Sequence, residues 1–167
     1  MDKKSAALNT PHVWIFLRLA ISFILLWAFF DKLLGLGFAT PSDKSWIKGV
    51  SPTFGFLKFG LVGFFAPFFQ NLAGNAIVDL LFMMGLLCIG LSLFLNIGIR
   101  IAGIAGALLM FLMWLSLFPP KNNPFIDEHI VYLIIFVGFA SIEQNTQFGL
   151  GNWWKKTTLV KKYPFLR

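Results

Sequence analysis

The chain alternates between long apolar stretches and short polar connections. A membrane-spanning helix needs about 20 mostly apolar residues to cross roughly 30 Å of hydrocarbon. The stretch over 13–35 meets this length, whereas a second stretch over 76–118 would be about 65 Å long as one helix, twice what a bilayer accepts. Because Asn96–Arg100 holds turn-forming residues and a charge, it divides this stretch. The pattern therefore predicts spans over 13–35, 76–97 and 100–118, the last ended by Pro119-Pro120.

Two weaker stretches remain. Residues 126–145 have an uncharged centre with acidic residues at the edges, which predicts a fourth span. Residues 54–70 contain a shorter apolar run that includes Pro67, and this is typical of an interfacial or re-entrant segment. A five-span alternative, in which this segment also crosses, satisfies the positive-inside rule as well as four spans do. Its length, Lys58 and Pro67 favour four.

Composition indicates that these stretches lie in a membrane. Of the 167 residues, 57% are hydrophobic and 13% are charged, whereas soluble domains carry about 25% charged residues. The mean hydropathy is +0.77. The predicted class is all-α, an integral membrane four-helix bundle with an additional interfacial or re-entrant segment around 54–70, in a single domain over 1–167. We expect an uncleaved N-terminal anchor and both termini on the cytoplasmic side of the cell's inner membrane.

Charge and cysteine content exclude several classes of site. The net charge is +7, and the basic C-terminal tail indicates contacts with lipid headgroups rather than with nucleic acid. The single Cys88 excludes an internal disulfide, a CxxC redox pair and a cysteine-rich metal site within this chain. His12 and His129 fall at opposite membrane faces, which excludes a bis-histidine haem, and no glycine-rich phosphate loop is present. No metal, haem or flavin is therefore predicted.

Helix packing is predicted from small residues and from one polar stripe. Small residues four apart on one span let a second helix approach closely, and Gly85 and Gly90 are expected to act similarly on the span before it. On the first span, one stripe at helical spacing should face the bundle. The pairs of small residues are Ala102/Gly106 and Gly103/Ala107, and the stripe is Arg18, Ser22, Leu25, Phe29 and Lys32.

Ionisable residues within or beside the spans are the candidate functional groups, because charge inside a bilayer is costly unless it is paired or hydrated. In the four-span arrangement most of them collect at the non-cytoplasmic helix ends. There we expect Lys32, Asn122 and Asn123 to bind an anionic substrate, and Asp79, Asp127 and His129 to transfer protons. Arg18, in the opposite leaflet, is a separate substrate-binding candidate. The apolar helix faces beside them would suit a lipid-soluble quinone.

Each of these residues also has a purely structural interpretation. Asp127 and Glu128 at a helix start can satisfy free N–H groups and the helix dipole. Asp31 and Lys32 can form an interfacial ion pair, His129 can be an ordinary interface residue, and Arg18 can extend to the headgroups.

Several motifs resemble the DoxX/DoxD family of membrane proteins. The first span resembles the family's opening helix, and the later motifs resemble the DoxD small subunits of thiosulfate:quinone oxidoreductase. The motifs are Arg18-x3-Ser22 through Asp31-Lys32-Leu33, the loop Ser45–Thr53, the segment Asn122–Tyr132, and the ending from Gly149-Leu150-Gly151 through Trp154 to Pro164–Arg167.

This resemblance implies a four-helix membrane bundle. It further implies a subunit that passes electrons from thiosulfate to membrane quinone, yielding tetrathionate, beside a second subunit called DoxA. The donor could also be another reduced sulfur compound. The alternative is a non-catalytic membrane scaffold or accessory subunit of another redox or respiratory complex. A homo-oligomer is compatible with both functions.

Overall fold

The computed structural model describes residues 10–141 and 148–166, and every regular element in this part of the chain is helical. Four longer helices alternate with short ones. The longer helices are α1 (Thr10–Leu34), α3 (Ala76–Leu95), α4 (Ile99–Ser116) and α5 (Glu128–Ser141). The short elements are η1 (Ser42–Lys44), η2 (Trp46–Lys48), the single π-helical turn η3 (Phe56–Gly60), α2 (Ala66–Gln70), α6 (Gly151–Lys156), α7 (Thr158–Lys162) and η4 (Pro164–Leu166).

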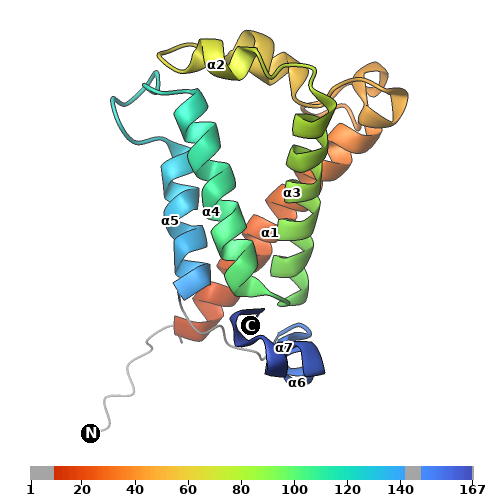
Figure 1. The fold of residues 1–167 in the computed structure, drawn as a ribbon, viewed down its shortest axis with the longest axis vertical. Coiled ribbons are helices and arrows are strands. Elements are labelled where there is room, and N and C mark those ends of the chain that lie inside the picture. Colours follow the sequence, from red (N-terminus) through yellow and green to blue (C-terminus); the bar gives the residue numbers. More distant parts are fainter. Residues whose placement is uncertain (1–9, 142–147, 167) are drawn as a thin grey trace, which may run out of the picture.

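The longer helices form two pairs, α1 with α3 and α4 with α5 (Figure 1). The pairs meet where α3 turns into α4, and they diverge toward the other end of the molecule. Helix α1 runs obliquely behind them, so its start lies beside the end of α5. There the rings of Trp14 and Phe139 make an edge-to-face contact with centroids 5.8 Å apart. Helix α1 therefore links both pairs.

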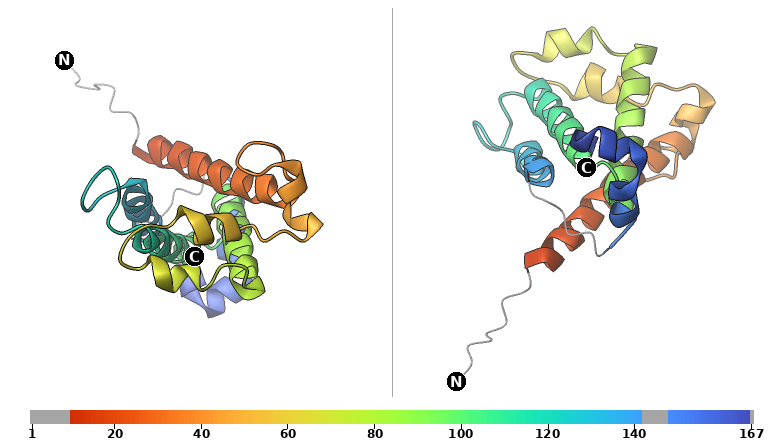
Figure 2. Two further views of the ribbon diagram at one scale, coloured as in Figure 1. Left: turned by 90° about the horizontal axis from the view of Figure 1, so that it is seen from above. Right: turned by 60° about the horizontal axis from the view of Figure 1, so that its bottom comes forward.

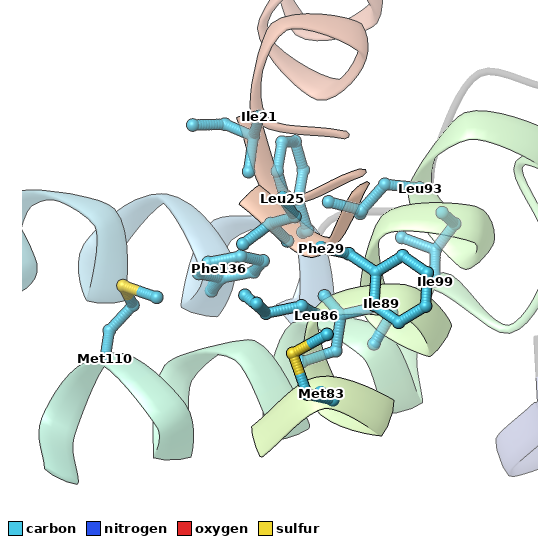
Figure 3. Packing of buried hydrophobic residues seen from close by; sticks show 12 residues of the cluster. Ile21, Leu25, Phe29, Met83, Leu86, Ile89, Leu93, Ile99, Met110 and Phe136 are labelled. Carbon is cyan, nitrogen blue, oxygen red and sulfur yellow. The ribbon is translucent and has the colours of Figure 1, made fainter. Parts of the chain in front are cut away.

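One apolar core lies among these helices (Figure 3). Its centre is formed by Phe136 of α5, Leu25 of α1 and Met83 of α3, all nearly inaccessible to solvent. Outward-facing positions are also apolar, with Phe16, Ile77 and other large side chains more than half exposed. Apolar side chains on both the inside and the outside of a helix are typical of membrane proteins.

Three of the helices, over His12–Leu34, Ala76–Leu95 and Ile99–Ser116, are long and apolar enough to cross a membrane. They confirm that the predicted spans 13–35, 76–97 and 100–118 are apolar helices of spanning length, to within a few residues. The predicted fourth span, 126–145, corresponds to α5, which has 14 residues and is about 21 Å long. Residues 142–145 of that prediction lie outside the described residues.

The predicted turn between the second and third spans is confirmed. Asn96 ends α3 with φ +60°, and Gly98 precedes α4 with φ +61°. Both angles lie in the left-handed region, which glycine and asparagine enter most readily. These two residues therefore reverse the chain without a longer loop.

The small-residue predictions are confirmed at three of the positions. A Cβ added to Gly103 would lie 2.7 Å from backbone atoms of α5, and one added to Gly106 would lie 2.3 Å from the Phe136 ring. A Cβ added to Gly90 would lie 2.9 Å from the Leu26 side chain of α1. The prediction for Gly85 is wrong, because nothing lies within 4 Å of the position of its Cβ. Its surroundings are open, so it mediates no close helix contact.

Residues 51–70, the cap segment, lie across the diverging ends of the two helix pairs (Figure 1). Both of its helices, η3 and α2, have only five residues. At one side the Phe64 N–H donates to the Phe118 carbonyl, just past α4, at 3.2 Å. Leu57, Leu61 and Ala66 form a small core against partners that include Leu117. The segment thus bridges the helix pairs instead of running along them.

Residues 148–166, the C-terminal platform, lie at the opposite end of the molecule, beneath the α3–α4 turn (Figure 2). The Leu150 N–H donates to the Leu95 carbonyl at 2.7 Å, and the Trp154 indole donates to the Leu166 carbonyl at 2.7 Å. Gly149 and Gly151 let this segment approach Leu95 and Asn96 closely. The start of α1 lies at this same end, which we call the platform end, and the other is the cap end.

Candidate functional site

An acid–imidazole pair lies at the start of α5. The Nδ1 atom of His129 is 2.9 Å from Oδ2 of Asp127, and each side chain is 12% exposed. The other carboxylate oxygen, Oδ1, accepts the backbone N–H groups of His129 at 3.0 Å and Ile130 at 3.3 Å. Asp127 therefore caps the helix, as its structural interpretation predicts, and one side chain carries both the cap and the contact with the imidazole.

This contact determines which nitrogen of the neutral His129 ring carries the hydrogen. An ionised carboxylate can only accept hydrogen bonds, so beside ionised Asp127 the Nδ1 atom of a neutral imidazole carries the hydrogen and donates a hydrogen bond to Oδ2. The second ring nitrogen, Nε2, is then the basic atom. Orienting an imidazole through one nitrogen while the other remains reactive is how carboxylate–histidine pairs work in general acid–base catalysis. The pair can hold or release one proton.

The turn that precedes the pair is held by its own polar atoms. Oδ1 of Asn123 accepts the backbone N–H groups of Phe125 at 3.0 Å and Ile126 at 3.1 Å. The Trp114 indole of α4 donates to the Phe125 carbonyl at 2.9 Å. Asn122 is exposed on the same turn. The carboxamide oxygen of Asn123 thus orders the turn, and Asn122 presents its side chain to the surroundings.

Asp79 lies at the other helix pair, in the first turn of α3, and is 5% exposed. Its Oδ1 accepts the hydroxyl groups of Thr53 at 2.5 Å and Ser51 at 2.8 Å. These two hydroxyl groups begin the cap segment. The carboxylate therefore ties the cap segment to α3, as the Phe64–Phe118 hydrogen bond ties it to α4.

Asp31 and Lys32 lie at the end of α1 and, both within the described part of the chain, form no ion pair. The buried carboxylate of Asp31 instead accepts the backbone N–H groups of Ala39 at 3.0 Å and Phe38 at 3.2 Å. The interfacial ion-pair interpretation is therefore wrong. Asp31 fastens the loop after α1, and Lys32 is half-buried beside it.

Arg18 is buried at the platform end, with 1% of its surface exposed. One guanidinium nitrogen donates to the Leu93 carbonyl in the last turn of α3, and the other donates to the Phe148 carbonyl at 3.0 Å. Ser22, one turn along α1, donates to the Gly90 carbonyl at 2.9 Å. The prediction that this stripe faces the bundle is confirmed, and Arg18 does not extend to the headgroups.

The predicted site residues do not all come together. Asp127, His129 and the Asn122–Asn123 turn are joined at the start of α5, whereas Asp79 and Lys32 lie at the α1–α3 pair on the other side of the molecule (Figures 1 and 2). Arg18 is at the opposite end, as the sequence places it. The expectation that these residues collect into one group at the non-cytoplasmic helix ends is therefore wrong. Its physical reason is the divergence of the two pairs, which the cap segment covers.

Possible ligand atoms for a metal ion also occur at the start of α5. Asp127, Glu128 and His129 offer three ligand atoms within 4.8 Å of one another. Asp127 and His129 are already hydrogen-bonded to each other and Glu128 is exposed, and exposed acidic groups often lie close together without a metal ion. An open apolar groove of about 350 Å³ lies at the platform end, lined by His12, Ile15, Phe16, Leu19 and Phe148.

The structure adds residues that the sequence did not single out. Ser51 and Thr53 bind Asp79, Trp114 holds the turn before α5, and the Phe148 carbonyl binds Arg18. A hydroxyl pair two residues apart in the loop before a buried carboxylate was a usable signal for Ser51 and Thr53. Backbone carbonyl partners leave no side-chain signal in a sequence.

No family model, curated protein or solved structure matches this chain.

Proposed function

We propose that this chain is a DoxX/DoxD-type membrane protein that passes electrons from a reduced sulfur compound such as thiosulfate to membrane quinone. The observation that carries the proposal is the Asp127–His129 pair at the start of α5. Quinone reduction consumes two protons as well as two electrons, and such a pair can deliver one of these protons beside an apolar, lipid-facing helix. The sequence resemblance supplies the substrates.

The proposed reaction transfers two electrons and two protons to each quinone. Two thiosulfate ions form one sulfur–sulfur bond and yield tetrathionate with release of two electrons. The quinone takes these two electrons with two protons and becomes a quinol. His129, when protonated, donates one of these protons from Nε2 to a quinone oxygen and water supplies the second, while Asp127 holds the ring through Nδ1. Asp127 and His129 are the proposed catalytic residues, and Asp79, whose side chain accepts hydrogen bonds from Ser51 and Thr53 of the cap segment, is a positioning residue.

The anionic substrate requires a cation or N–H donors. Asn122 lies on the turn beside the catalytic pair, and Lys121, which precedes it, is exposed. Lys32 remains a candidate at the other helix pair, where it is half-buried and free of an ion pair with Asp31. These two lysines define alternative positions for thiosulfate, one beside His129 and one remote from it.

A four-helix bundle in which α5 is the fourth span completes the proposal. The start of α1 and the C-terminal platform lie at one end of the molecule (Figure 1), which supports an even number of crossings. The cap segment lies across the other end, which favours four spans over five. By the positive-inside rule the platform end is cytoplasmic, and the catalytic pair then faces the outside of the inner membrane.

The test is thiosulfate-dependent quinone reduction by the purified full chain in nanodiscs, alone and with candidate partner subunits. His129→Gln should lower turnover by a factor of about 10²–10⁴, the usual contribution of a positioned acid or base. Asp127→Asn should also lower turnover, since asparagine keeps the helix cap but loses the charge. His12→Ala, at the opposite end, is the matched control. Wild-type turnover in both pair variants would refute the site.

The position of the anion is tested by comparing Lys32→Ala with Lys121→Ala. If thiosulfate binds beside His129, Lys121→Ala raises KM and Lys32→Ala leaves it unchanged. The reverse result places the anion at the α1–α3 pair. Lys58→Ala, which removes an exposed cation of the same end, controls for a general loss of positive charge.

A second function, a non-catalytic scaffold or accessory subunit of another redox complex, is favoured by a specific observation. Arg18, Asp31 and Asp79 are all buried and all bind groups of this chain. Most of the costly polar groups therefore hold the fold. A scaffold would show no turnover with any quinone but would co-purify with a redox complex, and Asp127→Asn would not change that yield.

A further inference from the structure

We propose that the C-terminal platform, together with Arg100, binds the anionic headgroups of the lipid leaflet at the platform end. The proposal does not depend on the oxidoreductase activity. It rests on the membrane location of the helices and on the charge distribution between the two ends of the molecule.

Charge is segregated between the ends. At the platform end Arg100, Lys156, Lys161 and Lys162 are exposed. The acidic residues that the structure describes all lie at the cap end or in the elements that lead to it: Asp31, Asp43, Asp79, Asp127 and Glu128. Within the described part of the chain, no carboxylate side chain therefore offsets these four cations.

The platform is docked firmly enough to present its charges as a surface. Its first residues bind the end of α3 through the Leu150 N–H and bind α1 through the Phe148 carbonyl, which accepts from buried Arg18. Val160 is completely buried, and Thr157 caps α7 by accepting the Val160 N–H at 3.4 Å. The cations thus lie on a folded element and not on a free tail.

The depth of the platform matches the headgroup region. Helix α3 has 20 residues and is about 30 Å long, the thickness of the hydrocarbon core. The platform lies just beyond its end. Its exposed aromatic side chains, Trp153, Tyr163 and Phe165, are of the kind that settles at the membrane interface. Aromatic rings in the interface and ammonium groups beside lipid phosphates form one continuous contact with the bilayer.

The occupant is a lipid headgroup because the surface joins the membrane-spanning helices without a break. A basic segment beside a spanning helix is attracted by the surface potential of anionic lipids, at roughly a fivefold gain for each lysine. The group that the lysines would recognise on a lipid headgroup is its phosphate. Inorganic phosphate or a nucleic acid presents the same group without a bilayer. The experiment must therefore separate these sources.

The test measures lysine acylation by mass spectrometry in nanodiscs, which expose both faces to the reagent. Nanodiscs of phosphatidylcholine are compared with nanodiscs of equal parts phosphatidylcholine and phosphatidylglycerol. Anionic lipid should slow labelling of Lys156, Lys161 and Lys162 about fivefold and of Lys44, Lys48 and Lys58, at the cap end, less than twofold. Salt at 1 M, with a Debye length of about 3 Å, should remove the difference. Equal slowing at both ends, or none, overturns the proposal.

Two further arms identify the source of the phosphate. Inorganic phosphate or a single-stranded RNA is added to phosphatidylcholine nanodiscs at low salt. Neither should slow labelling of the platform lysines. Protection by inorganic phosphate without anionic lipid would indicate a small-anion site, and protection by RNA would indicate a nucleic-acid surface, and either result overturns the proposal.

A matched pair of triple variants provides an independent readout. K156Q/K161Q/K162Q and K44Q/K48Q/K58Q remove the same number of exposed charges from opposite ends. In neutral detergent, added phosphatidylglycerol should raise the melting temperature of the wild type and of the cap-end variant but not of the platform variant. A rise retained by the platform variant, or lost by both, contradicts the proposal.

Discussion

The two helix pairs are held together by different kinds of contact. Between α1 and α3, buried polar side chains bind backbone carbonyls, with Arg18 on Leu93 and Ser22 on Gly90. Between α4 and α5, Gly103 and Gly106 let the helices approach until α5 backbone and the Phe136 ring fill the space of a side chain. Close packing occurs in both pairs, since Gly90 of α3 also lies against Leu26 of α1, but only the α1–α3 pair adds buried side-chain hydrogen bonds between its helices, among the residues that the structure describes.

This difference separates structural polar groups from candidate catalytic ones. Arg18, Asp31 and Asp79, the buried charged residues that the structure describes, belong to α1 and α3 and hold loops or helix ends. On the other pair, Asp127 and His129 bind only within their own helical turn and remain partly exposed. Because α4 and α5 pack by shape, the polar groups at the start of α5 are not required to join the helices. They are therefore available for chemistry.

The largest expected effect comes from filling the close contact of the α4–α5 pair. The double substitution G103A/G106A places methyl groups within 2.7 Å and 2.3 Å of α5 atoms, and each overpacked methyl costs about 1–3 kcal/mol. We expect a loss of about 3 kcal/mol, measured as a lower melting temperature in neutral detergent. Gly85→Ala, with nothing within 4 Å, is the control and should leave stability unchanged or improve it. Equal losses in both variants would show that these contacts are not tight.

The next largest effect is expected from Arg18→Met, which removes the guanidinium from the Leu93 and Phe148 carbonyls. Hydrogen bonds to a charged group contribute about 1.5–3 kcal/mol, and the C-terminal platform loses one of its attachments. Hydrogen exchange should accelerate in the platform and at the end of α3, while the α4–α5 amides keep their protection. Arg100→Met, which removes an exposed cation, is the control. Faster exchange spread evenly over both pairs would refute the assignment of Arg18 to α1–α3.

Asp79→Ala should have a smaller and more local effect. It deprives the Ser51 and Thr53 hydroxyl groups of their acceptor, at an expected loss of about 1–2 kcal/mol. Exchange should accelerate over the first half of the cap segment, and KM should change more than kcat if Asp79 only positions that segment. Asp43→Ala, in the exposed element η1, serves as the control. A loss of turnover as large as that of His129→Gln would instead return Asp79 to the catalytic residues.

The spans and the turn between α3 and α4 could be predicted because each depends on local residues, such as the apolar runs and Asn96 with Gly98. The inward stripe of α1 follows equally from helical periodicity. The separation of the site residues could not be predicted, since it required the angle between the helix pairs. That angle involves long-range contacts at the cap, such as the hydrogen bond from the Phe64 N–H to the Phe118 carbonyl, and a backbone contact of this kind has no pattern in the chain. Gly85 shows the same limit, because a glycine in a span does not reveal whether a neighbour approaches it.

The smallest expected effect comes from removing a buried serine hydroxyl group. It compares the two pairs most directly, because each pair contains one buried serine in a helix. Ser22 donates to Gly90 on another helix at 2.9 Å, whereas Ser116 donates to Met113 in its own turn at 2.7 Å. A hydrogen bond between membrane helices contributes about 0.6 kcal/mol on average, so Ser22→Ala should lower the free energy of unfolding by about that amount. Ser116→Ala should change it less, because it breaks no contact between helices. If Ser116→Ala cost as much as Ser22→Ala, the loss would reflect the burial of a hydroxyl group in either pair, and directional bonding would not distinguish α1–α3 from α4–α5.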